Sequence, residues 1–133
     1  MRNPHHPIGE PITLPNGTTV PLSPGFLSGD FLFLSGQLAF NDDGTPHAGD
    51  IAEQTERCLG SIERLLSEAG LDRNDVVKVT AWLTNAEDFP GFNQAYAAFF
   101  ADHRPARSTV CSQLLLPGAR VEIEAVARIG RVE

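Results

Sequence analysis

A strand-like run at residues 31–40 constrains the fold most, because it is apolar on both of its alternating faces. Its sequence is FLFLSGQLAF. Side chains of a strand point alternately to the two faces of a sheet, so such a strand needs cover on both. A helix can cover one face, and something else must cover the other. Phe26-Leu27 and a Ser28-Gly29-Asp30 turn precede the run.

Two later segments predict helices that can supply the first cover. From Ile51 to Ala69 apolar residues recur at helical spacing, and charged residues occupy the opposite side. Asp50 and Glu53 have the spacing of a capping box, and Gly70 suits the left-handed position past the helix end. A second helix is predicted over residues 88–103, with its aromatic residues on one face.

Further strands are predicted at residues 76–84, 107–114 and 121–129. The order of strands, helix, strand, helix and strands predicts two helices packed on one face of a mixed β-sheet, an α+β domain. Residues 1–25 are rich in turn formers. Within residues 1–20, two extended pieces flank Asn16-Gly17, which predicts a proline-rich arm or an edge hairpin.

Length, charge and cysteine usage exclude several classes of protein. A chain of 133 residues suits one domain, taken here as residues 1–133. A net charge of −7 argues against a nucleic-acid partner, which needs a basic face. Cys58 and Cys111 have neither disulfide-framework nor zinc spacing, and no histidine has metal-ligand spacing. No apolar run predicts a membrane span or a secretory signal, so a cytoplasmic protein without a bound metal is expected.

Three charged residues near the end of the chain are candidates for chemistry. Arg107 follows a proline stop and opens a mostly apolar strand, where its rigid fork could hold a carboxylate; the alternative is an ordinary surface arginine. Glu122 and Glu124 share one face of the last strand. Either carboxylate could position a water molecule if it lay near an arginine, or both could simply be solvated.

Two uncharged residues are also candidates. Gly36 follows an apolar strand and would let a ligand or another backbone approach closely; the alternative is a bulge or a packing glycine. Asn93 lies beside the aromatic stripe of the second helix, where a solvent-facing polar residue is equally ordinary.

From about Pro21 to Ile129 the chain resembles the Rid/YjgF family of imine and enamine deaminases, also known as L-PSP proteins. The resemblance rests on motifs that occur in the same order at consistent spacing: Ser35-Gly36-Gln37, Gly49-Asp50-Ile51, Glu53-Gln54-Thr55, Asp75 to Thr80, Asp88-Phe89, Asn93, Tyr96, Phe99-Phe100, Pro105 to Val110, Leu116-Pro117-Gly118 and Val121 to Ala125.

The resemblance implies a chorismate-mutase-like fold assembled as a homotrimer, with clefts between subunits. It also implies cofactor-free hydrolysis of 2-imino acids or enamines to 2-keto acids and ammonia, acting on a small substrate that bears a carboxylate. Arg107 matches the arginine that holds this carboxylate, and Glu122 matches the glutamate associated with the catalytic water. Ser35, Gly36 and Asn93 match positions that line the cleft.

Two positions in the expected substrate site depart from well-known deaminases. Leu22 stands where they have a tyrosine, and Thr109 where they often have a cysteine. These differences predict a more apolar cleft and a divergent subfamily. A ligand-binding trimer without turnover remains an alternative. So does an RNA-cleaving translation inhibitor, against which the acidic charge and the single lysine, Lys78, both count.

Overall fold

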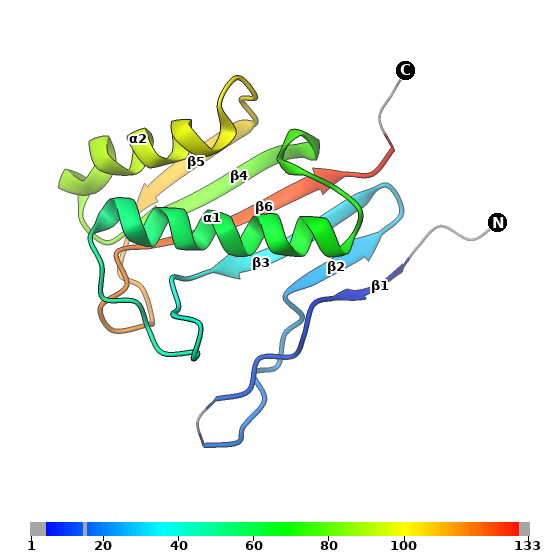
Figure 1. The fold of residues 1–133 in the computed structure, drawn as a ribbon, viewed down its shortest axis with the longest axis horizontal. Helices are drawn as coiled ribbons and strands as arrows, with labels where there is room; N and C mark the ends of the chain where they lie inside the picture. Colours follow the sequence, from blue (N-terminus) through cyan, green and yellow to red (C-terminus); the bar gives the residue numbers. More distant parts are fainter. Residues whose placement is uncertain (1–4, 15, 131–133) are drawn as a thin grey trace.

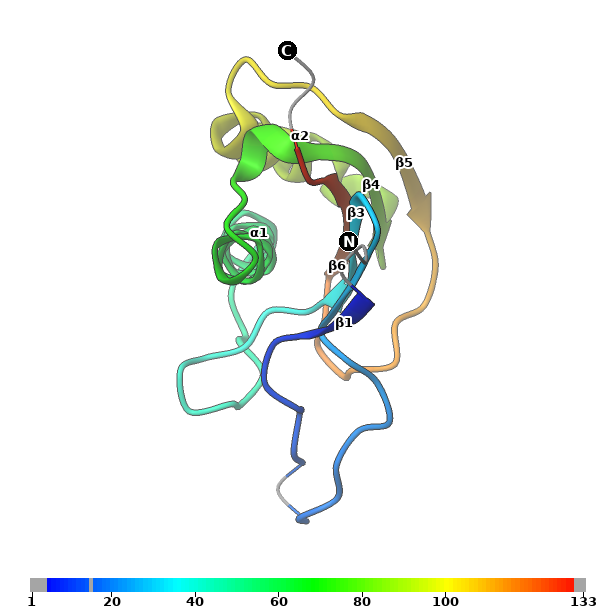
Figure 2. The same ribbon diagram turned by 90° about the vertical axis from the view of Figure 1, so that its right-hand side faces the viewer.

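The computed structural model describes residues 5–14 and 16–130, and in them two helices lie on one face of a mixed sheet (Figures 1 and 2). The six strands are ordered β1-β2-β3-β6-β4-β5, and only the pair β4–β5 is parallel. The predicted α+β arrangement is confirmed. The strands are β1 (His5–Ile8), β2 (Gly25–Ser28), β3 (Phe31–Gln37), β4 (Val76–Leu83), β5 (Ala106–Cys111) and β6 (Val121–Arg128), and the helices are α1 (Ile51–Glu68) and α2 (Phe89–Phe100), with short 3₁₀ turns at Arg73–Asp75 and Ala86–Asp88.

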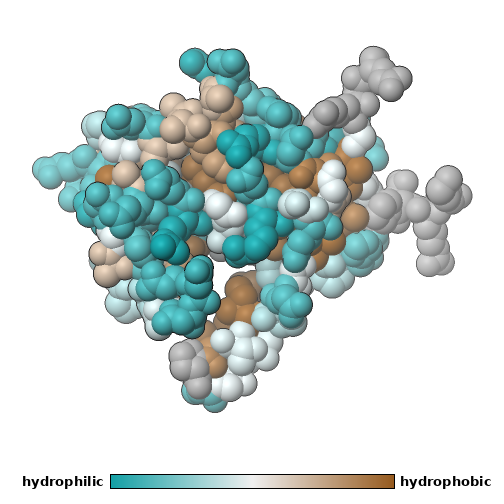
Figure 3. Space-filling view, viewed as in Figure 1, coloured by the Kyte–Doolittle hydropathy of each residue, from teal (hydrophilic) through white to brown (hydrophobic). Residues whose placement is uncertain are grey.

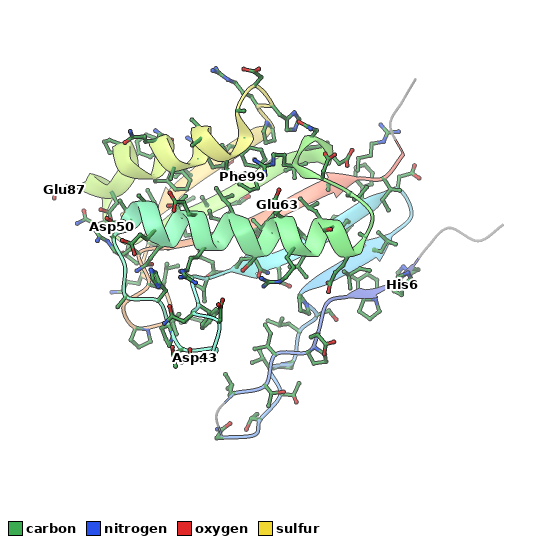
Figure 4. The ribbon with its side chains drawn as sticks, viewed as in Figure 1. His6, Asp43, Asp50, Glu63, Glu87 and Phe99 are labelled. Atoms are coloured by element: carbon green, nitrogen blue, oxygen red, sulfur yellow. The ribbon has the colours of Figure 1, made fainter. Side chains whose placement is uncertain are left out.

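The ends of α1 follow the predicted signals. The Asp50 carboxylate accepts a hydrogen bond from the backbone nitrogen of Glu53 at 2.9 Å, and Gly70 adopts the left-handed conformation with φ +74°. Figure 4 labels Asp50 at the start of this helix. The opposite, outward side of α1 is largely hydrophilic (Figure 3). The buried side chains of α1 are Gln54, Thr55, Cys58, Leu59, Ile62, Leu65 and Leu66.

Only one face of β3 receives cover from this chain. Leu32 and Leu34 are buried on the face that both helices cover. Phe31 and Phe33 point the other way and are 39% and 48% exposed. The second cover that the sequence required is therefore missing from the described part of a single chain.

Some strands begin or end away from their predicted bounds. His5–Ile8 was not predicted as a strand, yet it pairs with β2 at the sheet edge. Its formation depends on an available partner more than on its own pattern. Residues 12–14 and 18–20 are joined by one bridge, Thr13 to Thr19. β3 stops at Gln37, after a register shift against β6, instead of at residue 40.

The second helix is shorter than predicted. α2 runs from Phe89 to Phe100, with Pro90 in its first turn, where the missing N–H is tolerated. Phe92, Tyr96 and Phe100 are its buried aromatic residues. Between the two helices, Arg73 donates hydrogen bonds to the Glu63 carboxylate of α1 and to a backbone carbonyl of α2 (Figure 4). No helix among the described residues is long and apolar enough to cross a membrane.

A buried amide ties α1 to the turn before β6. Gln54 is 1% exposed, and its Nε2 donates to the carbonyls of Gly49 and Gly118, each at 3.2 Å. Its Oε1 accepts from the backbone nitrogen of Arg120 at 2.8 Å. The three hydrogen bonds are partly buried and join α1 to the turn before β6, so this one side chain fixes where β6 begins.

Replacing the amide should therefore destabilise the fold. Gln54→Leu keeps a buried apolar stem but leaves backbone groups unpaired, at about 1–3 kcal/mol for each one that water cannot reach. We expect a lower midpoint of urea unfolding. Glu56→Ala, at an exposed position of the same helix, is the control and should change stability by less than about 0.5 kcal/mol. A Gln54→Leu variant as stable as the parent would contradict this role.

Candidate functional site

The predicted site residues fall into two groups on opposite faces of the sheet. Strand β4 lies between β5 and β6 and pairs with both: Val79 with Arg107, and Trp82 with Glu122. Directly paired residues point to the same face, whereas residues 79 and 82 point to opposite faces. Val79 is fully buried under the helices. Arg107 therefore lies on the helix-covered face and Glu122 on the open face.

The first group surrounds Glu122. Its carboxylate lies directly against the backbone of Gly36, where a Cβ atom would stand 2.0 Å from Oε2. No residue larger than glycine fits there without moving the carboxylate. Ser35 Oγ donates to the carbonyl of Ser23 at 2.6 Å, which anchors β3 beside the exposed Leu22. The structure thus brings Gly36 and Glu122 together, with Ser35 next to Gly36 in β3, and the close approach predicted at Gly36 is made by the chain's own side chain.

The surroundings of Glu122 shift the ionisation of its carboxyl. Burial raises the pKa of Glu122, and the negative charge of Glu124 on the same face raises that pKa further. A carboxyl with a raised pKa exchanges protons at a pH closer to neutral than an ordinary glutamate does. This is the property that a general acid–base group needs.

The second group surrounds Arg107. Its guanidinium carbon lies 4.7 Å from the ring centroid of Tyr96, 5.2 Å from that of Phe92 and 5.8 Å from that of Phe89. Within the described ranges it makes no hydrogen bond or ion pair. Thr109 follows two residues later on the same face, and its Oγ1 is buried without a partner. Partly buried donors without an acceptor provide what an anionic group requires.

Asn93 belongs to the helix that covers Arg107. It follows Phe92 on α2, is partly buried, and has no side-chain hydrogen bond within residues 5–14 and 16–130. The structure therefore places Arg107, Thr109 and Asn93 in one region. Neither a hydrogen bond nor an ion pair links that region to Glu122 within the described chain.

Arg120 ties the start of β6 to the start of α2, and sequence patterns did not single it out. Its Nη2 and Nε donate to the two carboxylate oxygens of Asp88 at 2.7 and 3.1 Å, and Asp88 is buried immediately before α2. Arg120 lies two residues before Glu122, and its backbone nitrogen donates to Gln54 Oε1. The ion pair joins residues 32 apart in sequence, so only the folded chain reveals it.

Residues that commonly bind metals are dispersed or engaged elsewhere. Among the described residues there is no group of three histidine, cysteine or acidic side chains that could hold a metal ion. The two ring nitrogens of His47 lie 2.8 Å from Asn41 Oδ1 and 2.9 Å from Glu53 Oε2. Cys58 is buried as predicted, and burial raises the pKa of its thiol to about 12.

The raised pKa of Glu122 makes a prediction about stability. The pKa of Glu122 is higher in the folded state than in the unfolded state. Ionisation of Glu122 therefore lowers the free energy of unfolding as the pH rises from the ordinary glutamate range through the folded pKa. Glu122→Gln removes this cost. It should raise the urea midpoint at neutral pH, and the gain should vanish at pH values below the ordinary glutamate range. The exposed Glu56→Gln is the control, and a gain independent of pH would contradict the argument.

Comparisons with known proteins cover almost the whole chain. The family described as "Endoribonuclease L-PSP" matches residues 15–129. A RutC family protein of Pyrococcus abyssi is 39% identical over 108 residues, which is 80% of this chain and 85% of that protein. The 3-aminoacrylate deaminase RutC of Acinetobacter baylyi is 37% identical over 122 residues, 89% of this chain and 97% of that protein.

A solved structure agrees with the fold. YyfA of Yersinia pestis, from the conserved Rid protein family, has a TM-score of 0.84 and 33% sequence identity. The match covers 95% of this chain and 100% of that one. The region that is similar in sequence and in structure therefore includes both groups of site residues.

Proposed function

Since the chain belongs to the L-PSP family, which includes the Rid/YjgF proteins, we propose that it hydrolyses 2-imino acids and their enamine tautomers to 2-keto acids and ammonia. The observation that carries the proposal is the unpaired, partly buried guanidinium of Arg107. The name of the Acinetobacter relative supports it, since 3-aminoacrylate is an enamine that bears a carboxylate.

Arg107 holds the substrate carboxylate. Its planar fork donates two parallel hydrogen bonds to the two oxygens, and the aromatic rings fix the plane of the fork. Thr109 Oγ1 adds a further donor. The reacting carbon is adjacent to the carboxylate, so this grip also sets the position of the imine.

Glu122 positions and activates the water. The water oxygen bonds to the imine carbon while one of its protons passes to Glu122, which returns it to the imine nitrogen and so forms a carbinolamine. The remaining hydroxyl proton then passes through Glu122 to the nitrogen as the C–N bond breaks and the C=O bond forms, so the nitrogen leaves as ammonia. The imine carbon is already electrophilic, so orientation and proton transfer suffice and no cofactor is required.

The complete site requires a second copy of the chain. One chain presents Arg107 and Glu122 on opposite faces of its sheet, so it cannot bring both to one small substrate. We propose a closed homotrimer whose clefts combine Arg107, Asn93 and Thr109 of one subunit with Glu122 and Gly36 of the next. The exposed Phe31 and Phe33 support this assembly, because a neighbouring subunit supplies the missing cover.

The family description also names an endoribonuclease. The net charge of −7 disfavours RNA, whose phosphates need basic partners.

Leu22, in place of a tyrosine, makes the cleft more apolar and suits imines with apolar side chains. We propose a cytoplasmic location, where such intermediates are released by amino-acid metabolism.

Ammonia release tests the proposal directly. Imino acids are generated in situ by an amino-acid oxidase, with semicarbazide as a competing trap. Arg107→Lys should lose most activity despite keeping its charge, since an ammonium cannot form the two parallel bonds. Glu122→Gln should lower kcat by about 10²- to 10⁴-fold, while Glu124→Gln stays active.

Three outcomes would count against these assignments. Full activity in Arg107→Lys would show that fork geometry is irrelevant. An inactive Glu124→Gln variant together with an active Glu122→Gln variant would assign the role of the base to Glu124. RNA cleavage by the parent, with no effect on imino acids, would favour the endoribonuclease alternative.

Mixing variants tests the shared cleft. Arg107→Ala and Glu122→Gln should each be inactive alone. In mixed trimers, a cleft that joins the intact Arg107 of one variant to the intact Glu122 of the other should work. Random assembly at equal amounts predicts recovery of about one quarter of the parental activity. If mixing restores nothing although mass spectrometry shows mixed trimers, both residues act within one chain.

A further inference from the structure

Tyr96 carries a buried hydroxyl that has no partner in the part of the chain that the structure describes. The residue is 9% exposed, and within residues 5–14 and 16–130 its Oη has no hydrogen bond. Burying a hydroxyl unpaired costs free energy, so such groups are uncommon in folded proteins. The hydroxyl needs an explanation beyond packing, since phenylalanine would fill the same space without that cost.

The surroundings of Tyr96 indicate which kind of hydrogen-bond partner suits the hydroxyl. Of the three rings around the Arg107 guanidinium, that of Tyr96 is the nearest, with its centroid at 4.7 Å. Thr109 Oγ1, on the same face as Arg107, is also buried and unpaired. Three neighbouring side chains therefore offer hydrogen-bond donors, and none of them finds an acceptor in the described residues.

The hydroxyl remains a donor throughout the working pH range. Burial raises the pKa of Tyr96 to about 12, although the positive charge of Arg107 opposes the rise. A phenol that stays protonated can donate to an anion, whereas a phenolate would repel it. The lowering influence of Arg107 also shows that the guanidinium acts electrostatically on this phenol.

We propose that Tyr96 is a further substrate-binding residue, whose hydroxyl donates a hydrogen bond to the same carboxylate that Arg107 holds. A carboxylate has about four lone-pair sites, enough for the two bonds of the fork and for hydroxyl donors as well. The inference rests on the proposed function. It adds that the site recognises a substrate with a planar carboxylate through Tyr96 as well as through Arg107.

This role predicts opposite effects of the hydroxyl on the stability of the free protein and on the binding of a carboxylate. The free protein carries the cost of an unpaired hydroxyl, and a bound carboxylate relieves it. Tyr96→Phe keeps the ring over Arg107 but removes the hydroxyl. The unliganded variant should melt at the same temperature as the parent or higher, and it should bind a carboxylate more weakly.

Pyruvate, a 2-keto acid of the product class, serves as the probe. Calorimetry and ligand-induced shifts in melting temperature should show binding to Tyr96→Phe weakened about 10- to 100-fold, the range for hydrogen bonds to charged groups. Pyruvamide, which lacks the carboxylate, should not distinguish the variant from the parent.

Thr55→Val provides a matched control. Thr55 Oγ1 is likewise buried and unpaired, but it lies on α1, whereas all three rings around Arg107 belong to α2. This nearly isosteric variant should leave pyruvate binding unchanged. It separates loss of any unpaired core hydroxyl from loss of this particular one.

The outcomes separate this inference from the proposed function. If Arg107→Lys weakens pyruvate binding but Tyr96→Phe binds as tightly as the parent, the role of Tyr96 is overturned and the proposed function stands. A Tyr96→Phe variant that melts lower, and binds pyruvate and pyruvamide equally poorly, shows a structural hydroxyl and also overturns the inference. If the parent binds no pyruvate, the proposed function itself fails.

Discussion

Side-chain alternation across a single sheet is the constraint on which the remaining structure depends. Strand β4 pairs with both β5 and β6, so its alternation places Arg107 under the helices and Glu122 on the uncovered face. No rotamer change carries a side chain through a hydrogen-bonded sheet. A reaction that uses both residues on one small substrate would therefore need two chains, and Phe33 is exposed on the open face.

Hydrogen bonding divides the polar side chains of the interior into two kinds. Gln54 and Arg120 have hydrogen-bond partners, and together they hold the start of β6 and the start of α2 in place. Arg107, Tyr96 and Thr109 have side-chain donors without an acceptor among the described residues. Hydrogen-bonded groups make the structure more rigid, whereas buried donors without a partner lower its stability.

Much of the architecture could be predicted from the sequence. Apolar spacing identified both helices, and alternation identified the central strands, because each pattern directly reflects which face is buried. The edge strand His5–Ile8 was not predicted, because its residues carry no strand pattern and it forms by pairing with the edge of β2. The Asp88–Arg120 ion pair was not predicted either, because neither residue lies in a pattern that identifies its partner.

The sequence by itself determined the fold class, the family and the residue types available for chemistry, including Arg107 and Glu122. Only the tertiary structure decided that these two residues lie on opposite faces, that Glu122 lies against Gly36, and that the hydroxyl of Tyr96 has no partner among the residues described. The reason is physical. Local patterns record which face of its own element a side chain occupies, whereas strand pairing and packing between distant segments decide which faces meet.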